Sequence, residues 1–334
     1  MYSERASEWI SLAVGCKMAH SEPAIAAMKR LLFLILGVLC LGSPARSIAQ
    51  PRDQIRAGDA TIEIRYDAPA PSEALRQMIL RRVALSAKAV TSYYQRYPVH
   101  AAYIQVGFHR GRGINSGHAF GWPVAHMAVS VGRDSTATDF AADWVTTHEM
   151  VHLAFPSVAE EHHWIEEGLA TYVEPVARAR TGELSPQKVW GDMVEGMPNG
   201  LPQAGDRGLD FTHTWGRTYW GGALFCLLAD VAIHEQTANR AGLDTALRAI
   251  LGATGGYGAE RDIEEVLRIG DGATGTRILE EAYARMGTSA VTPDLPRLWA
   301  RLGVPQDPRS QPFDENAPLA AVRRAITSPA ANPR

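Results

Sequence analysis

The segment His148-Glu149-Met150-Val151-His152 carries two imidazoles four residues apart, with a carboxylate directly after the first. Residues four apart lie on one face of an α-helix, so both imidazoles can reach the same metal ion. Neutral imidazole nitrogens suit zinc, and a catalytic zinc keeps three protein ligands and one water. Glu149 projects about 100° away from His148 and can take a proton from that water without binding the ion. The segment predicts a zinc site with His148 and His152 as ligands and Glu149 as general base.

The residues around this motif favour a helix. Large apolar side chains recur near it, namely Phe140, Trp144, Val151 and Phe155. They predict a buried helix over 138–155, which Pro156 ends. The alternative is a helix whose histidines bond only to protein neighbours, so a third ligand decides between the two interpretations. The metzincin pattern would need Gly and His where Phe155 and Val158 stand, which excludes it.

Residues 164–174 read Trp-Ile-Glu-Glu-Gly-Leu-Ala-Thr-Tyr-Val-Glu. This stretch resembles the second zinc helix of gluzincin metallopeptidases, notably the large zinc aminopeptidases, in which the glutamate before the glycine is the third ligand. The chain looks like a stand-alone, peptidase-MA-like gluzincin domain. The resemblance implies one zinc ion, with Glu167 as its third ligand and a peptide or protein as substrate. It also implies that Glu174, about 20° from the same helical face, orients a zinc histidine.

The connection over 153–166 is shorter than in the large aminopeptidases. It contains two further histidines, His162 and His163, which are alternative third ligands. The sequence around them, Ala-Glu-Glu-His-His, is polar and more typical of a solvated loop than of a metal site.

Tyr219 stands near the start of a later apolar helix, which is predicted over 215–234. Zinc aminopeptidases use a tyrosine in a Tyr-x-Lys-Gly-Ala pattern to stabilise the tetrahedral anion. The sequence Tyr-Trp-Gly-Gly-Ala over 219–223 is similar, with Gly221 in place of the lysine. The resemblance implies that Tyr219 donates a hydrogen bond to the anion, a contribution of about 3 kcal/mol. The alternative is a tyrosine that packs at the start of a core helix.

The substrate strand of those aminopeptidases carries a glutamate that grips a free amino group. Here no glutamate occurs between Glu73 and Glu149, which favours an endopeptidase over an aminopeptidase. A strand near 124–131 is expected at the sheet edge beside the zinc helix. Its residues Ala125, His126 and Met127 would bind an extended substrate by backbone pairing. The glycine-rich stretch 111–121 before it would be a mobile lip or an ordinary hairpin connection.

The expected fold class is α+β. A small mixed sheet with an edge strand along the cleft packs on a zinc-binding helix pair, and a mostly helical C-terminal part follows. Strands are predicted at 61–66, 102–108 and 126–131, and helices at 72–97, 138–155, 164–180, 215–234, 240–251, 260–268, 274–286 and 294–302. The metallopeptidase domain would cover 50–305, with an α/β part over about 58–155 and a helical part over about 156–305. The Pro-, Ala- and Arg-rich tail, 306–334, is expected to be poorly ordered.

The N-terminus reads as a leader. From Met28, two cations precede an apolar run over 31–42 and then the small-residue sequence Ser47-Ile48-Ala49. This is the layout of a secretory signal, with cleavage expected after Ala49. The apolar run is shorter than the roughly 20 residues of a stable membrane span, although a retained anchor is the alternative. Residues 1–49 are therefore expected to be an N-terminal extension and signal peptide of an exported bacterial protein, periplasmic or secreted.

Composition narrows the function classes. The formal net charge of −3 over 334 residues gives no support for a nucleic acid as partner. Two of the three cysteines would leave with the leader, so Cys226 cannot form an internal disulfide and is expected to be buried. The predicted function is an exported zinc metallopeptidase. The rival prediction is a catalytically inactive envelope protein that uses a metallopeptidase-like fold to bind a partner.

Overall fold

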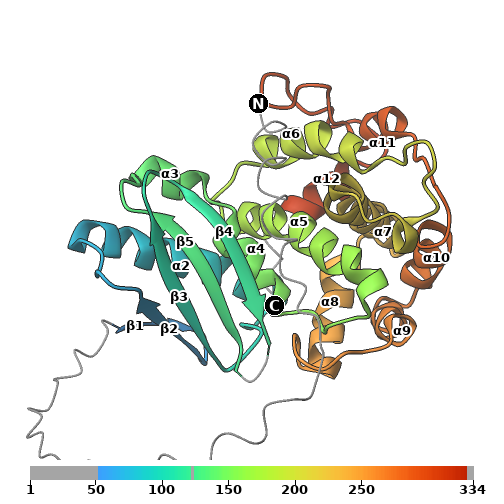
Figure 1. Cartoon of the computed structure of the whole chain (residues 1–334). Coiled ribbons are helices and arrows are strands. Elements are labelled where there is room, and N and C mark those ends of the chain that lie inside the picture. The colour runs from blue at the N-terminus through green and yellow to red at the C-terminus, as the bar shows by residue number, and fades with distance from the viewer. Residues whose placement is uncertain (1–51, 122–123, 329–334) are drawn as a thin grey trace, which may run out of the picture. The chain divides into compact units, whose positions relative to one another are not determined.

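The computed structural model describes residues 52–121 and 124–328; the predicted leader lies outside the described residues. The fold is α+β, with a five-stranded mixed sheet first and a mostly helical part after it, as the sequence predicted (Figure 1). The strands are β1 (Arg52–Ala57), β2 (Ala60–Tyr66), β3 (Ala101–His109), β4 (Ile114–Phe120) and β5 (His126–Gly132). Their order is β1-β2-β3-β5-β4. The three central strands are parallel, and the outer strands pair antiparallel to their neighbours.

Alternation along the central strands creates one buried face. Ile62, Ile64, Ile104, Val106 and Met127 are all fully buried. Helix α2 (Glu73–Tyr94) covers this face, and its Ile79 and Val83 lie against side chains of β5. Ser72 caps the helix by accepting a hydrogen bond from the Leu75 amide at 3.3 Å. The helix ends at Gln95, whose φ of 61° is left-handed, slightly before the predicted end.

The sheet edge beside the zinc motif is β4, and this corrects the prediction that the strand near 124–131 would be the edge. β5 lies between β3 and β4, so its backbone is paired on both sides. β4 falls within the stretch 111–121, which was expected to be a lip or a connection. It packs against helix α4 (Val145–His152). Gly117 and several polar residues hid β4, because they weaken its alternation of apolar and polar residues.

The single helix predicted over 138–155 is two helices, α3 (Ala137–Ala142) and α4. The chain turns at Asp143, which has an extended backbone. Its carboxylate accepts hydrogen bonds from the amides of Val145 at 2.9 Å and Thr146 at 3.4 Å. Asp143 therefore caps the zinc-motif helix directly, which is a start signal that the apolar spacing concealed.

The helical part is built on α5 (His163–Arg180) and α7 (Gly222–Gln236). The two helices cross at a pair of glycines: a Cβ on Gly168 would lie 2.3 Å from both Cα and C of Gly222. A short π-helical segment, η4 (Gly216–Gly221), precedes α7. The remaining helices largely follow the predicted ranges: α8 (Leu243–Thr254), α9 (Ile263–Thr274), α10 (Ile278–Met286) and α11 (Leu295–Leu302). Short 3-10 turns lie at η1 (Glu160–His162), η2 (Met197–Gly200) and η3 (Leu209–Phe211).

Two helices were not predicted. α6 (Pro186–Gly196) begins at Ser185, which caps it, and Pro186, which suits a first helical turn. α12 (Ala320–Thr327) lies in the tail that was expected to be poorly ordered. Its Ile326 is fully buried, and the Ile326 carbonyl accepts a hydrogen bond from Nε of Arg180 at 2.8 Å. The arginines that made the tail look disordered include such anchors: Arg323 is 2% exposed and donates to the Leu302 carbonyl at 2.9 Å.

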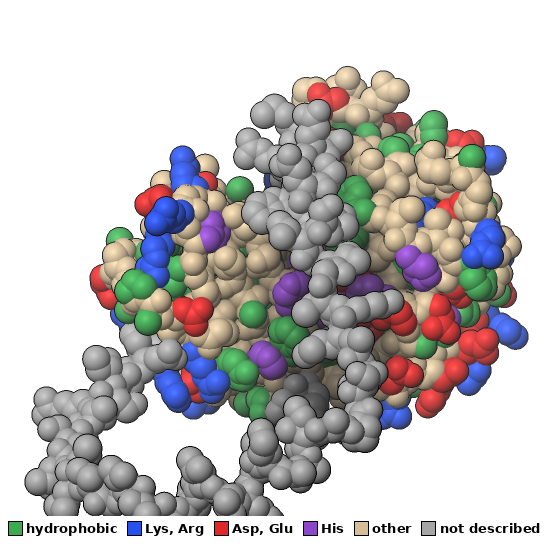
Figure 2. Space-filling view, viewed as in Figure 1, with side chains coloured by type: hydrophobic (Ala, Val, Ile, Leu, Met, Phe, Trp, Pro, Cys, Tyr) green, Lys and Arg blue, Asp and Glu red, His purple; other side chains and the backbone are tan. Residues whose placement is uncertain are grey.

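The surface carries both signs of charge. On the face seen in Figure 2, basic and acidic side chains both occur and neither covers the face continuously, in keeping with the small net charge. Across the described residues, every helix is too short or too polar to pass through a lipid bilayer.

Candidate active site

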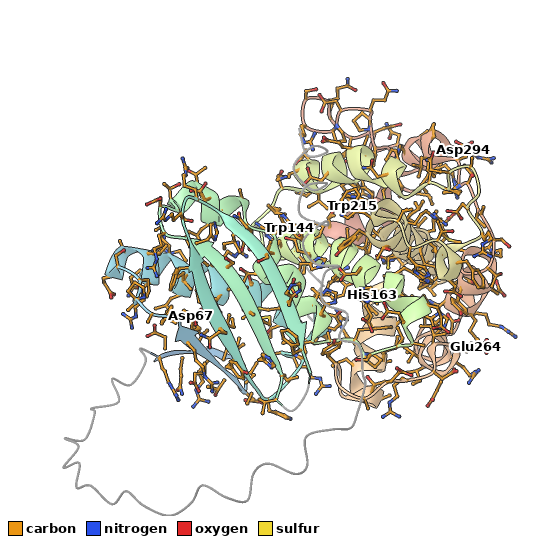
Figure 3. The ribbon with its side chains drawn as sticks, in the orientation of Figure 1. Asp67, Trp144, His163, Trp215, Glu264 and Asp294 are labelled. Carbon is orange, nitrogen blue, oxygen red and sulfur yellow. The ribbon has the colours of Figure 1, made fainter. Side chains whose placement is uncertain are left out.

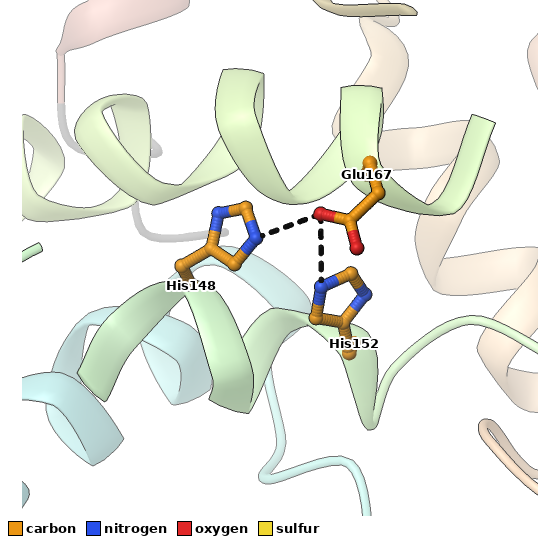
Figure 4. A group of neighbouring side chains, drawn as sticks. All are labelled: His148, His152 and Glu167. Carbon is orange, nitrogen blue, oxygen red and sulfur yellow. Dashed lines mark hydrogen bonds and ion pairs between the residues drawn. The ribbon is translucent and has the colours of Figure 1, made fainter. Parts of the chain in front are cut away.

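The structure brings together the three side chains predicted to bind zinc (Figure 4). Nε2 of His148 lies 3.1 Å from Oε2 of Glu167, and Nε2 of His152 lies 3.6 Å from the same oxygen. One ligand atom from each residue falls within 4.8 Å of the other two. The two histidines extend from successive turns of α4, and Glu167 extends from the first turns of α5, which packs on it.

The donor set fits a zinc ion. Two ligand atoms that each lie about 2 Å from a tetrahedral ion are roughly 3.3 Å apart. The two nitrogen–oxygen distances, 3.1 Å and 3.6 Å, lie on either side of that value. Two imidazoles and one carboxylate are also the ligand type that catalytic zinc sites use, with a fourth position left for water or substrate.

Burial and the pairing of opposite charges set the protonation of the ligands. Burial alone would raise the pKa of Glu167, but hydrogen bonds from His148, His152 and His163 outweigh it and hold that pKa far below its usual range. Burial lowers the pKa of His148, which favours the neutral imidazole that metals bind. For His152, the contact with Glu167 outweighs burial and raises the pKa. A metal ion at this site would therefore compete with a proton for His152.

Glu149 follows the first histidine and lies between α4 and β4. Burial raises the pKa of its carboxyl to about 7, the charge of Glu167 adds to this rise, and the charge of His152 and the Ala119 backbone amide oppose it. A Cβ on Gly117 would lie 2.5 Å from Cγ of Glu149, so β4 passes directly over this side chain. A carboxyl with a pKa near neutrality beside a metal site suits a general base.

Tyr219 lies in η4, close to the first histidine. The ring centroids of Tyr219 and His148 are 6.4 Å apart. Burial, with the charges of Glu167 and Glu149, raises the pKa of the phenol well above its usual value, so the hydroxyl keeps its proton. A protonated phenol at this position is available as a hydrogen-bond donor.

Two exposed tryptophans extend this row of rings. Trp144 packs edge-on against His148 at 5.2 Å, and Trp215 stacks on Tyr219 at 6.1 Å. Each is 45% exposed, and both are labelled in Figure 3. Both are large apolar side chains that solvent still reaches.

Of the two histidines in the connecting segment, His162 bonds to a residue outside the candidate ligands, and His163 contacts one of the ligands. His162 Nδ1 lies 2.9 Å from Oδ1 of Asp210, an aspartate that also accepts from Trp164. His163 lies nearer the site, with Nε2 3.4 Å from Oε1 of Glu167. Its Nδ1 is 3.2 Å from Glu166, and the two carboxylates raise the pKa of His163 to about 10. His163 thus contacts the oxygen of Glu167 that is not shared by His148 and His152.

Glu174 differs from its predicted role. Its Oε1 accepts a hydrogen bond from Nη1 of Arg178 at 2.5 Å, where contact with a zinc histidine was expected. Burial outweighs this arginine and raises the pKa of Glu174 to about 7. Seven residues of helix carry the side chain two turns along α5, which places it near the start of α4, beside Arg178 and Asp143.

The predicted substrate-binding residues also differ. Ala125 precedes β5 and is 9% exposed, and Met127 is fully buried in the core. His126 points to the opposite face of the sheet, where it stacks between Tyr103 and Phe120 at 4.7 Å from each. None of the three lies on the edge strand, so the backbone free to pair with an extended substrate beside α4 belongs to β4.

Comparisons with known proteins find a similarity in fold alone. Neither a protein-family model nor a curated protein matches the chain. Among solved structures, an M1 zinc metallopeptidase from Deinococcus radiodurans is 16% identical, with a TM-score of 0.48 over 73% of this chain and 52% of that one. An aminopeptidase N family protein from Idiomarina loihiensis is 12% identical, with a TM-score of 0.46 over 85% of this chain and 47% of that one. The chain spans about half the length of these structures.

Proposed function

We propose that this chain is a zinc-dependent peptidase. The observation that carries the proposal is the convergence of His148, His152 and Glu167, whose ligand atoms lie within 4.8 Å of one another on two packed helices. The arrangement leaves Glu149 beside the three ligands and outside the donor set. This separation of binding and basic groups is what metal-assisted hydrolysis requires.

The residues divide the work of hydrolysis. A zinc ion held by the three ligands would supply Lewis acidity, which lowers the pKa of water and polarises a carbonyl. Glu149 accepts the proton as water attacks, and it can later pass that proton to the leaving amine. Tyr219 donates a hydrogen bond to the oxygen on which negative charge develops. β4 would hold the substrate in an extended form through its free backbone groups.

We propose peptides as substrates, with cleavage inside the chain. Every residue of β4 lacks an acidic side chain, and the sequence has no glutamate from residue 74 to 148. A carboxylate is the usual partner of a free amino terminus, and β4 does not offer one. We also propose that the protein is exported, on the strength of its leader sequence.

The central experiment measures zinc content and peptide cleavage together. The purified protein should bind one equivalent of zinc and cleave members of an unbiased peptide library, and a chelator should stop the cleavage. Glu149→Gln should keep zinc but lower kcat by about 10²- to 10⁴-fold. The matched control is Glu161→Gln, an exposed glutamate on η1, which should leave kcat unchanged. Stoichiometric zinc without cleavage of any library member would instead favour the non-catalytic binding protein.

Two further measurements test the finer parts of the proposal. One peptide is offered with a free and with an acetylated N-terminus, and an endopeptidase should cleave both at similar rates. A requirement for the free amine would contradict internal cleavage. Export is tested by expressing the full chain in a bacterium and sequencing the N-terminus of the product in each cell fraction. Intact protein confined to the cytoplasm would refute it.

A further inference from the structure

A group of buried charged side chains joins α2, the start of α4 and the end of α5. Every member has a side-chain exposure of 14% or less. We call this group the buried ion network, and its members are Arg82, Asp143, Glu174, Arg178 and Glu183. The proposed hydrolysis uses none of them, so their burial calls for another explanation.

Arg82, on α2, contacts three other segments of the chain. Both of its terminal nitrogens bond to the carboxylate of Glu183, with Nη2 at 3.2 Å from Oε2. Its Nε lies 3.7 Å from Oδ2 of Asp143. Nη2 also donates to Oγ1 of Thr147 at 3.2 Å, and that hydroxyl donates to Ser86 at 2.8 Å. One guanidinium therefore connects α2 to the zinc-motif helix and to the chain beyond α5.

These contacts hold the first turn of α4 at two points. Asp143 binds the amides of Val145 and Thr146, and Arg82 faces the other oxygen of Asp143. Thr147, fully buried, directly precedes His148. Because successive residues are about 100° apart around a helix, fixing Thr147 toward α2 also fixes the direction in which His148 projects.

A second arginine extends the network to α5, which carries Glu167. Arg178 donates from Nη1 to Glu174 at 2.5 Å and from Nε to Glu183 at 2.8 Å. Its Nη2 donates to the Ala141 carbonyl at 3.2 Å, on α3, the helix that precedes α4. Glu183 is shared by both arginines. The network thus couples the helix of the two histidines to the helix of the third ligand.

Stability alone does not explain such a group. Taking several charges out of water is expensive, and well-packed apolar side chains of similar volume often give equal or greater stability. What an apolar cluster cannot supply is direction, because hydrogen bonds with a planar guanidinium fix both distance and angle.

We propose that Arg82 is a positioning residue for the metal site, which acts through Thr147 and Asp143 to set the rotation of α4 against α5. The inference rests on the proposed function, since it concerns the same three ligands. It predicts that loss of the network changes the affinity and the geometry of zinc binding more than it changes folding.

The main test replaces the paired charges while keeping the volume and the helix cap. The variant Arg82→Met/Asp143→Asn/Glu183→Gln leaves no unpaired charge at these three positions, and the asparagine can still accept from the α4 amides. We expect a folded protein by circular dichroism, with a zinc Kd raised about 10- to 100-fold. Replacement of zinc by cobalt should give a visible spectrum that differs from that of the wild type, because ligand-field bands report the geometry of the ligands.

A smaller change tests the link itself. Thr147→Val keeps the shape of the side chain and removes only the hydroxyl between Arg82 and Ser86. It should also weaken zinc binding and shift the cobalt spectrum, by less than the triple variant. If the triple variant does not fold, the result for Thr147→Val decides the matter by itself.

The matched control is Arg180→Met. Arg180 is equally buried on α5, but it bonds to Asp244 at 2.7 Å and to the Ile326 carbonyl, outside the network. This variant should lose stability and keep the zinc Kd and the cobalt spectrum of the wild type. Wild-type zinc affinity and spectrum in a folded Thr147→Val or triple variant would overturn the inference. Absence of zinc binding by the wild-type protein would instead refute the proposed function.

Discussion

Two glycines make close contacts at the candidate site, and they differ in what they approach. A Cβ on Gly117 of β4 would meet the Glu149 side chain, with Cγ at 2.5 Å. A Cβ on Gly168 of α5 would meet the backbone of Gly222 at 2.3 Å. A side chain can rotate away, whereas two packed helices must separate. The first contact therefore sets the position of a reacting group, and the second sets the packing of the fold.

The largest effect is expected at the helix crossing. Gly168→Ala should lower the free energy of unfolding by about 3 kcal/mol, because the added methyl group forces α5 and α7 apart. Urea denaturation followed by tryptophan fluorescence measures this loss. A free energy within about 0.5 kcal/mol of the wild type would show that the crossing adapts, and the comparison would fail.

Removal of the metal should loosen α4, where Glu149 meets Gly117, and spare the crossing of Gly168 with Gly222. At a zinc concentration 100 times Kd, the ion should add about 2.7 kcal/mol to stability, which a chelator removes. The ligands lie on α4 and α5, so amide hydrogen exchange should speed up in α4 and change little in α7. Identical melting temperatures with and without chelator would contradict a site that bridges the two helices.

Gly117→Ala should impair catalysis more than stability. The added methyl group displaces Glu149, and a displacement of about 1 Å can lower the rate by up to about 100-fold. We expect kcat to fall by about 10- to 100-fold, with unfolding close to that of the wild type. Ser116→Ala, an exposed neighbour on β4, is the matched control and should keep full kcat. Unchanged kcat in Gly117→Ala would show that the base does not depend on this contact.

The smallest effect is expected at a helical glycine without close contacts, which serves as the reference for Gly117 and Gly168. Gly252 lies within α8, and a Cβ there would meet nothing within 4 Å. Gly252→Ala should raise the free energy of unfolding by about 0.5–1 kcal/mol, since alanine favours the helix. Calorimetry measures the shift in melting temperature. Destabilisation here would mean that helical glycines are sensitive for reasons other than close contact.

The sequence predicted the ligand group because its spacing is local. Two histidines four residues apart must share a helical face, and the glutamate before Gly168 stands in a stretch that resembles the second zinc helix of gluzincins. The central strands could be predicted equally well, because Ile62, Ile64 and Ile104 alternate with polar residues along the chain. These signals depend on neighbours in the chain.

The features that sequence reasoning missed depend on distant contacts. β4 was not recognised because Gly117 replaces an apolar residue where Glu149 packs against the strand. Glu174 is the exception: its partner Arg178 is only one helical turn away on α5, and the assignment to a histidine came from the resemblance. Arg82 gave no signal, since its partners outside α2 lie 61 to 101 residues further along the chain.

The burial of Cys226 has a practical consequence. It lies one turn after Gly222, fully enclosed where α7 packs on α5, and burial raises the pKa of its thiol well above the usual value. An alkylating reagent can attack it only while these helices are apart. The rate at which Cys226 is alkylated in the native protein therefore measures how often α5 and α7 separate beside the third ligand.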